Sequence, residues 1–189
     1  MNRKYAKPLF KLIESRWPHR WASYKKLAGG TTVGRTFRQL IEGGGAAFVF
    51  LWVDPKGAER FFCEFGWSAS GEPPVRRAGY GFPMQAPQMA FSQPEMVAGI
   101  QALWGDSGIG AWQVPDPVET FDPSQFNGNE EAAAKDFLAR LQRKNSLTDA
   151  EAEALVAPLV DNLLERLDNL VLPYLQEYVA AVAAKNRGS

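Results

Sequence analysis

Few side chains in this sequence could carry out chemistry. Its 189 residues include one histidine, His19, and one cysteine, Cys63. These two residues alone cannot form a structural zinc site, and an internal disulfide needs a second cysteine. The sequence also lacks a phosphate-binding loop, a dinucleotide-binding glycine motif, and the common metalloprotease and serine-hydrolase motifs. We therefore expect no cofactor, and the composition favours a non-enzymatic protein.

One carboxylate is expected inside a β-sheet. Glu64 lies in segment 60–67, whose alternating aromatic residues predict a strand. A carboxylate on a half-buried strand needs a partner, and Arg35 or Arg38 on a neighbouring strand could supply one. The pair would be either a structural ion pair or the centre of a binding or acid–base site. Trp67, at the end of the same strand, is a further candidate binding residue.

Three carboxylates follow a helical spacing near the end of the chain. Asp161, Glu165 and Asp168 are placed to share one helix face. Carboxylates can hold magnesium or calcium, but such sites usually draw ligands from more than one element. No second acidic cluster has a suitable spacing, so we expect no metal site. The stripe is expected to be a solvated face or a docking ridge for a basic partner.

A long connection rich in proline and glycine carries the second candidate binding surface. It extends over residues 68–91 and includes Arg76, Arg77 and Tyr80. Loops that a rigid sheet holds in place often carry binding residues. We predict that these three side chains form a recognition surface for a partner.

The net charge of zero hides a division between the two halves of the chain. Residues 1–80 carry 14 Lys and Arg and 6 Asp and Glu, whereas residues 81–189 carry 7 and 15. The halves therefore have formal charges of about +8 and −8. Either the two halves pack together and neutralise each other, or one of them faces an external partner of opposite charge.

The first part of the chain predicts a helix followed by an antiparallel sheet. Segment 4–17 has the spacing of an amphipathic helix that ends before Pro18. Segments 31–41, 46–53 and 60–67 predict strands, and 46–53 is apolar on both faces, as in a central strand. Glycines 43–45 permit one chain reversal, and Asp54-Pro55-Lys56-Gly57 predicts the next turn.

The second part predicts mainly helices. A capping box at 92–95 predicts a helix over 96–104, and segment 111–114 could add an edge strand. Segment 129–144 predicts a helix with a buried stripe of four residues: Ala133, Phe137, Leu138 and Leu141. A second capping box at Thr148 should begin a helical region that extends to the end of the chain, with kinks caused by Pro158 and Pro173.

These elements predict a single α+β domain over residues 1–189. Its N-terminal helix, antiparallel β-meander of three or more strands and loops occupy approximately 1–128, and C-terminal helices that pack on the sheet occupy 129–189. The longest apolar run has eight residues, 46–53, which is too short to span a membrane. No export signal is visible, and a lone cysteine is consistent with a reducing compartment, so we expect a cytoplasmic protein that does not bind membranes.

The function that these features favour is binding to another protein. The shortage of catalytic groups and the two oppositely charged halves, with long loops on a sheet, make a toxin-neutralising or regulatory protein our first hypothesis. The expected order of elements is similar to that of some small bacterial immunity-type proteins, but no diagnostic motif assigns a family. A nucleic-acid or polyanion binder is the alternative, because the basic half interleaves cations with aromatic residues. A small enzyme built on Glu64 and an arginine is the third. The sequence does not predict the oligomeric state.

Overall fold

The computed structural model describes most of the chain. The described residues are 1, 3–28, 34–54, 59–74, 94–103, 111–115, 118 and 120–187, without the side chains of 18–20, 186 and 187. The elements in chain order are α1 (Arg3–Arg20), β1 (Lys25–Lys26), β2 (Gly34–Leu40), β3 (Ala46–Val53), β4 (Arg60–Ser68), β5 (Glu95–Gly99), η1 (Ile100–Leu103), β6 (Ala111–Gln113), η2 (Pro123–Phe126), α2 (Glu130–Ser146), α3 (Asp149–Arg166), η3 (Leu167–Val171) and α4 (Leu172–Arg187).

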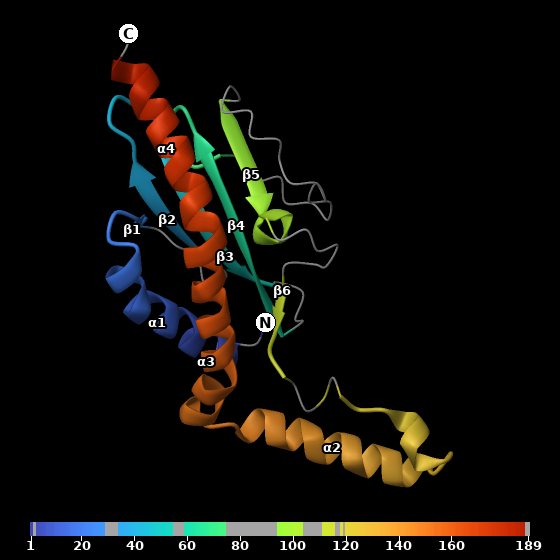
Figure 1. Cartoon of the computed structure of the whole chain (residues 1–189). Helices are drawn as coiled ribbons and strands as arrows, with labels where there is room; N and C mark the ends of the chain where they lie inside the picture. Colours follow the sequence, from blue (N-terminus) through green and yellow to red (C-terminus); the bar gives the residue numbers. More distant parts are fainter. Residues whose placement is uncertain are drawn as a thin grey trace.

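The sheet is an antiparallel meander. Its strands follow the order β1-β2-β3-β4-β5, and β6 pairs with β4 at residues 60–62. α1, α3 and α4 lie on the same side of this sheet (Figure 1). The predicted α+β class, the meander and the C-terminal helix on the sheet are therefore confirmed. The edge strand expected at 111–114 is also present, whereas the turn predicted at 54–57 falls outside the described residues beyond Asp54.

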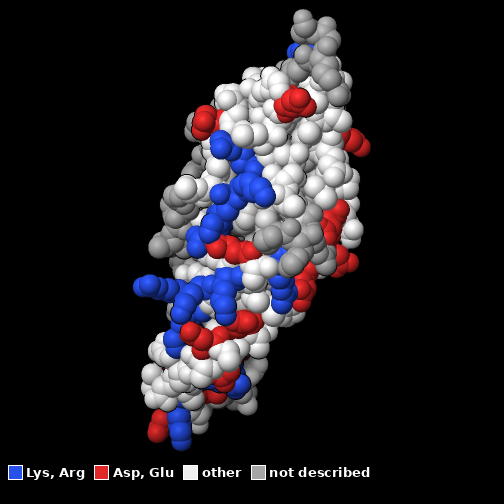
Figure 2. All heavy atoms as spheres, turned by 90° about the vertical axis from the view of Figure 1, so that its left-hand side faces the viewer, with Lys and Arg blue, Asp and Glu red and all other residues white. Residues whose placement is uncertain are grey.

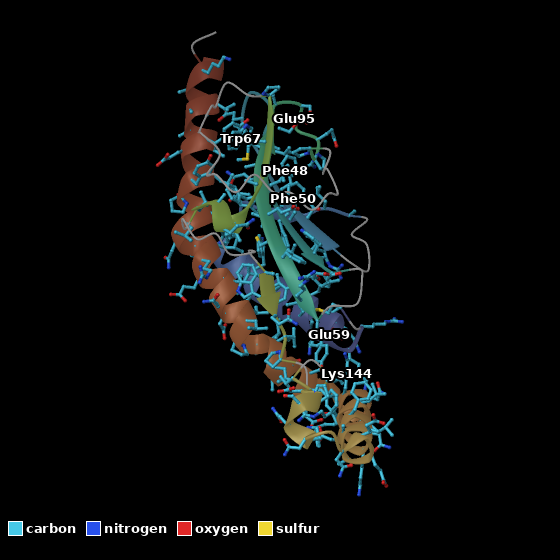
Figure 3. All side chains as sticks on the ribbon, turned by 90° about the vertical axis from the view of Figure 1, so that its right-hand side faces the viewer. Phe48, Phe50, Glu59, Trp67, Glu95 and Lys144 are labelled. Carbon is cyan, nitrogen blue, oxygen red and sulfur yellow. The ribbon has the colours of Figure 1, made fainter. Side chains whose placement is uncertain are left out.

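Strand β3 is buried on both faces, as its apolar sequence predicts. Val49 and Leu51 belong to the main core, which the helices complete. Phe48 and Phe50 point to the opposite face and form a second cluster with Ala46, against which Leu27 and Val97 pack. Phe48 and Phe50 stack with their ring centroids 5.7 Å apart (Figure 3). β3 therefore contributes side chains to the main core from one face and to the second cluster from the other.

Three successive glycines make the reversal between β2 and β3. Gly43, Gly44 and Gly45 have φ values of 84°, 123° and 85°. Residues with a Cβ rarely adopt such values, whereas glycine does so freely. The Ile41 N–H donates to the Gly45 carbonyl at 3.0 Å and closes the loop. The reversal expected at these glycines is therefore present.

The helices cover the main core from one side. α4 packs on the sheet through Tyr178, whose ring stacks on that of Trp67 with 4.4 Å between centroids. α3 packs mainly on α1 and reaches the sheet through Asn162, which accepts a hydrogen bond from the Trp112 indole at 2.9 Å. No helix in the described part of the chain combines the length and hydropathy that a bilayer-spanning segment requires.

Proline has different effects in the three long helices that contain it. α1 continues through Pro18 to Arg20, where we expected an earlier end, and the Trp21 N–H donates to the Trp17 carbonyl at 3.1 Å. Pro158 lies within α3 without interrupting it. The expected irregularity appears before Pro173, as the π-type turn η3, where the Leu172 N–H donates to the Leu167 carbonyl.

The helix predicted over 96–104 is wrong. Residues 95–99 form strand β5 against β4, and only the single turn η1 follows. Met96, Ala98 and Ile100 are buried, and their alternate spacing suits a strand. The exposed edge of β4 offers backbone hydrogen bonds along five residues, and this tertiary pairing outweighs the local capping signal.

The two-sided burial of β3 makes it intolerant of charge. Val49 is fully buried, so Val49→Asp should lower the free energy of unfolding by about 3–5 kcal/mol or more and prevent soluble expression. Leu40→Asp is the matched control, because Leu40 ends the neighbouring strand with 65% of its surface exposed. Thermal melting of both variants checks the prediction, and a Val49→Asp protein that melts with the parent would contradict it.

Candidate functional site

Glu64 and Arg35 lie on opposite faces of the sheet. Glu64 aligns with Phe50 of β3, whereas Arg35 aligns with Leu51, which in turn aligns with Cys63. Since neighbouring residues along a strand point to opposite faces, Arg35 cannot be the partner of Glu64. Burial, and then the charge of Glu64, raise the pKa of the Cys63 thiol well above its usual value. Cys63 is therefore a packed thiol and not a nucleophile.

Arg35 belongs to a different ion-pair cluster, on the helix side of the sheet. Its Nε donates to Glu14 Oε1 at 2.6 Å, and Lys26 Nζ donates to Glu14 Oε2 at 2.8 Å. The Arg35 guanidinium also lies over the Phe10 ring, 4.3 Å from its centroid. Burial opposes ionisation of Glu14, but the hydrogen bonds and charges of Lys26 and Arg35 outweigh it and lower the Glu14 pKa. This cluster joins α1 to β1 and β2.

The other predicted site residues are dispersed. Arg38 lies on the same face as Glu64, but β3 separates their strands, and Arg38 donates to the Gly71 carbonyl at 3.3 Å. Trp67 is 1% exposed and stacks against α4, so its side chain is part of the core. Arg76, Arg77 and Tyr80 lie outside the described residues, and their role in recognition stays a prediction.

The opposite charges of the two halves meet in a ladder between α1 and α3. Lys7 pairs with Asp149 at 3.3 Å, Lys11 pairs with Glu153 at 3.4 Å, and Arg16 pairs with Asp161. The partners advance together along both helices, so α1 and α3 run parallel. Figure 2 shows the resulting mixture of cations and carboxylates on this side of the molecule. Exposed pairs of this kind contribute about 0–1 kcal/mol each, so the ladder mainly sets the register of the two helices.

The acidic stripe on the C-terminal helices takes part in these contacts. Asp161 pairs with Arg16, and Asp168 accepts a hydrogen bond from the Trp21 indole at 2.7 Å. α1 of the same chain is therefore a basic partner of this ridge. Within the part of the chain that the structure describes, no three His, Cys, Asp or Glu residues are grouped closely enough to hold a metal ion.

A hollow of about 390 Å³ lies where α1 meets β1. Its walls include Trp17, Trp21, Tyr24 and Phe37, with Lys25 and Lys26 among the polar residues. The four aromatic residues are only 1–3% exposed, so they offer little surface to a ligand. The carboxylate of the hollow, Glu14, already pairs with two cations. We therefore do not assign a ligand site to this hollow.

Three of the four exposed large hydrophobic residues among the described residues lie on α2. The stripe expected to be buried in segment 129–144 is not: α2 contains no buried residue, and Phe137, Leu138 and Leu141 are 37%, 56% and 37% exposed. That prediction is wrong because α2 projects away from the sheet at an angle to α3, so neither the sheet nor α1, α3 or α4 covers its apolar face (Figure 1).

Several local contacts hold α2 in this projecting position. The Asn129 side chain accepts the Ala132 N–H at 3.0 Å and caps the start of the helix. The Phe121 ring packs edge-on against Phe137 with 5.3 Å between centroids. At the other end, Lys144 pairs with Glu59 at 2.8 Å, which anchors α2 to the start of β4 (Figure 3). α2 is therefore an ordered arm that contributes nothing to either core.

A compositional signal could have shown that this helix stays outside the core. α2 has three large apolar side chains, whereas α3, one residue longer, has six: Leu155, Val156, Leu159, Val160, Leu163 and Leu164. A narrow stripe on a polar helix suits a surface contact, whereas a wide stripe suits a core.

Comparisons with known proteins add no further constraint on this surface. No protein-family model, curated protein or solved structure matches the chain. The functional argument therefore depends on the geometry and chemistry of the residues described above.

The cluster around Glu14 predicts a pH-dependent contribution to stability. Glu14→Gln should lower the free energy of unfolding at pH 7 by about 1 kcal/mol, because Lys26 and Arg35 lose their shared anion. The folded state lowers the Glu14 pKa, so the stabilisation is present above the ordinary pKa of 4.5 and is lost as the pH falls through the folded-state value.

Urea unfolding of parent and variant at pH 7 and at about pH 3 measures this difference. The two proteins should differ at neutral pH and converge in acid. Glu153→Gln is the control, because its pair with Lys11 is longer and the lysine is 72% exposed. An equal difference between parent and Glu14→Gln at both pH values would show that the charge of Glu14 is not involved.

Proposed function

We propose that this protein is a non-enzymatic protein-binding module and that the apolar face of α2 is its binding surface. One observation carries the proposal. Among the described residues, four large hydrophobic side chains are exposed, and three of them, Phe137, Leu138 and Leu141, lie together on α2. Exposed apolar residues that are grouped and rimmed by polar residues are typical of interaction sites.

The shape of this surface suits a helix or a groove of another protein. Residues 137, 138 and 141 follow the one-, three- and four-residue spacing by which a helix presents anchors to a partner. Full burial of a leucine or phenylalanine side chain is worth about 1.5–3 kcal/mol, and between 37% and 56% of each of these residues is still exposed. The stripe can therefore contribute a few kcal/mol to binding.

The two alternative functions have less support. The enzyme hypothesis paired Glu64 with Arg35 or Arg38, and of these two arginines Arg35 lies on the opposite face and Arg38 donates to the Gly71 carbonyl. The polyanion hypothesis needed unneutralised cations in the basic half. Lys7, Lys11 and several other cations of that half pair with carboxylates of the same chain. Toxin neutralisation and regulation are roles that binding alone can perform, and we propose that the protein acts within this range.

Affinity capture with matched variants tests the proposed surface. Tagged full-length protein is exposed to lysate of its source cell, with and without nuclease. Leu138→Glu places a charge on the apolar face, whereas Ala139→Glu places the same charge on the opposite, exposed face. We expect proteins that the parent and Ala139→Glu retain, and that Leu138→Glu loses by about tenfold, whether or not nuclease is present.

Two results would contradict the proposal. Equal capture by all three baits would show that the α2 face binds nothing. Capture that nuclease abolishes would instead support the nucleic-acid alternative. Thermal melting of the three proteins serves as a check, because substitutions at exposed helix positions should change the melting temperature by only a few degrees.

A further inference from the structure

The exposed stripe of α2 has the spacing of a helix–helix contact. Ala134, Phe137, Leu138 and Leu141 are separated by one, three or four residues and share one face. Leu138, with 56% of its surface exposed, lies at the middle of the 17-residue helix. Because the stripe is centred on the helix, a second helix of similar length can cover it with both ends aligned.

The two ends of α2 carry opposite charges. Its first turn is acidic and its last turn is basic. Glu130 precedes Ala134 by four residues and Lys144 follows Leu141 by three, so both charged residues extend the apolar stripe along the same face. A copy of the helix that runs in the opposite direction therefore places an acidic end beside a basic end at both ends of the pair.

We propose that α2 binds α2 of a second copy of this chain, antiparallel, about a two-fold axis between Phe137 and Leu138. The proposal rests on the protein-binding function proposed above and names the partner. A two-fold interface needs a surface that is complementary to itself. In this arrangement the small Ala134 lies opposite the larger Leu141, Phe137 lies opposite Leu138, and the two helix dipoles oppose each other favourably.

The ion pair between Lys144 and Glu59 is compatible with this contact. Glu59 is buried, with 3% of its side chain exposed, whereas the Lys144 side chain is 18% exposed. An ammonium group has three donor hydrogens, so Lys144 can bind Glu59 and still donate to Glu130 of the second copy. The pair holds the ammonium group at the base of α2, where the acidic end of the second helix would arrive.

Sedimentation velocity of the full chain over a range of concentrations tests the pairing. We expect a concentration-dependent species of twice the 20.9 kDa chain mass. Leu138→Glu puts a charge beside the two-fold axis in both copies and should raise the dissociation constant by about tenfold or more. Ala139→Glu should leave the dissociation constant unchanged. Circular dichroism and thermal melting confirm that both variants are folded.

Disulfide trapping tests the orientation of the two helices. Ala134→Cys mixed with Leu141→Cys should cross-link under mild oxidation, because these positions face each other in the antiparallel pair. Ala134→Cys alone should not cross-link, since the two copies of residue 134 would lie about 10 Å apart along the helix axis. The native Cys63 is buried and should not react. Cross-linking of Ala134→Cys with itself would indicate a parallel pair and overturn the proposal.

The outcomes separate this inference from the proposed function. A monomer at every concentration overturns the self-pairing, and if Leu138→Glu still abolishes capture of a different protein, the proposed binding function stands. A dimer that Leu138→Glu leaves intact also overturns the self-pairing, because its interface lies elsewhere. A monomer whose captured proteins do not depend on residue 138 contradicts both.

Discussion

The two-sided burial of β3 is the constraint on which the rest of this structure depends. A strand that is apolar on both faces must be covered from both sides, so the sheet cannot leave one face in water. The helices meet this requirement on the side of Val49 and Leu51, whereas Phe48 and Phe50 belong to the second cluster on the other side. α1, α3 and α4 are therefore committed to the core. α2 is the one long helix in the described residues that is not.

The parts of the fold that could be predicted from sequence are those that one local pattern determines. The alternation in β4, the apolar run of β3 and the capping box at Thr148 each correspond to one element. Segment 95–99 was predicted incorrectly because its local capping signal favours a helix, whereas the free edge of β4 favours a strand. Pairing between distant segments is a tertiary effect that a local pattern does not contain.

The candidate site shows the same division between local and tertiary information. Helix formation by α2 could be predicted from its charges, and its narrow apolar stripe is a signal for a place outside the core. The direction in which the helix leaves the body, which exposes Leu138, could not be predicted, because it depends on tertiary contacts. The residue types at Glu64 and Arg35 suggested an ion pair, which strand register excludes. The charge division of the sequence left open whether the two halves neutralise each other or one of them faces a partner, and the ladder between α1 and α3 shows that part of the charge is paired within the chain.

The π-type turn between α3 and α4 allows one continuous helix to pack against two different elements. Buried residues follow one another at a steady helical spacing from Val156 to Tyr178, so a regular helix would present all of them in one direction. In the wider turn at Leu167–Val171 each residue rotates the chain by a smaller angle than in an α-helix. The row of buried residues therefore points in a different direction after the turn than before it. The buried residues therefore face α1 before the turn and the sheet after it. Without the change of direction at this turn, the buried residues of the helix could pack against α1 or against the sheet, but not against both.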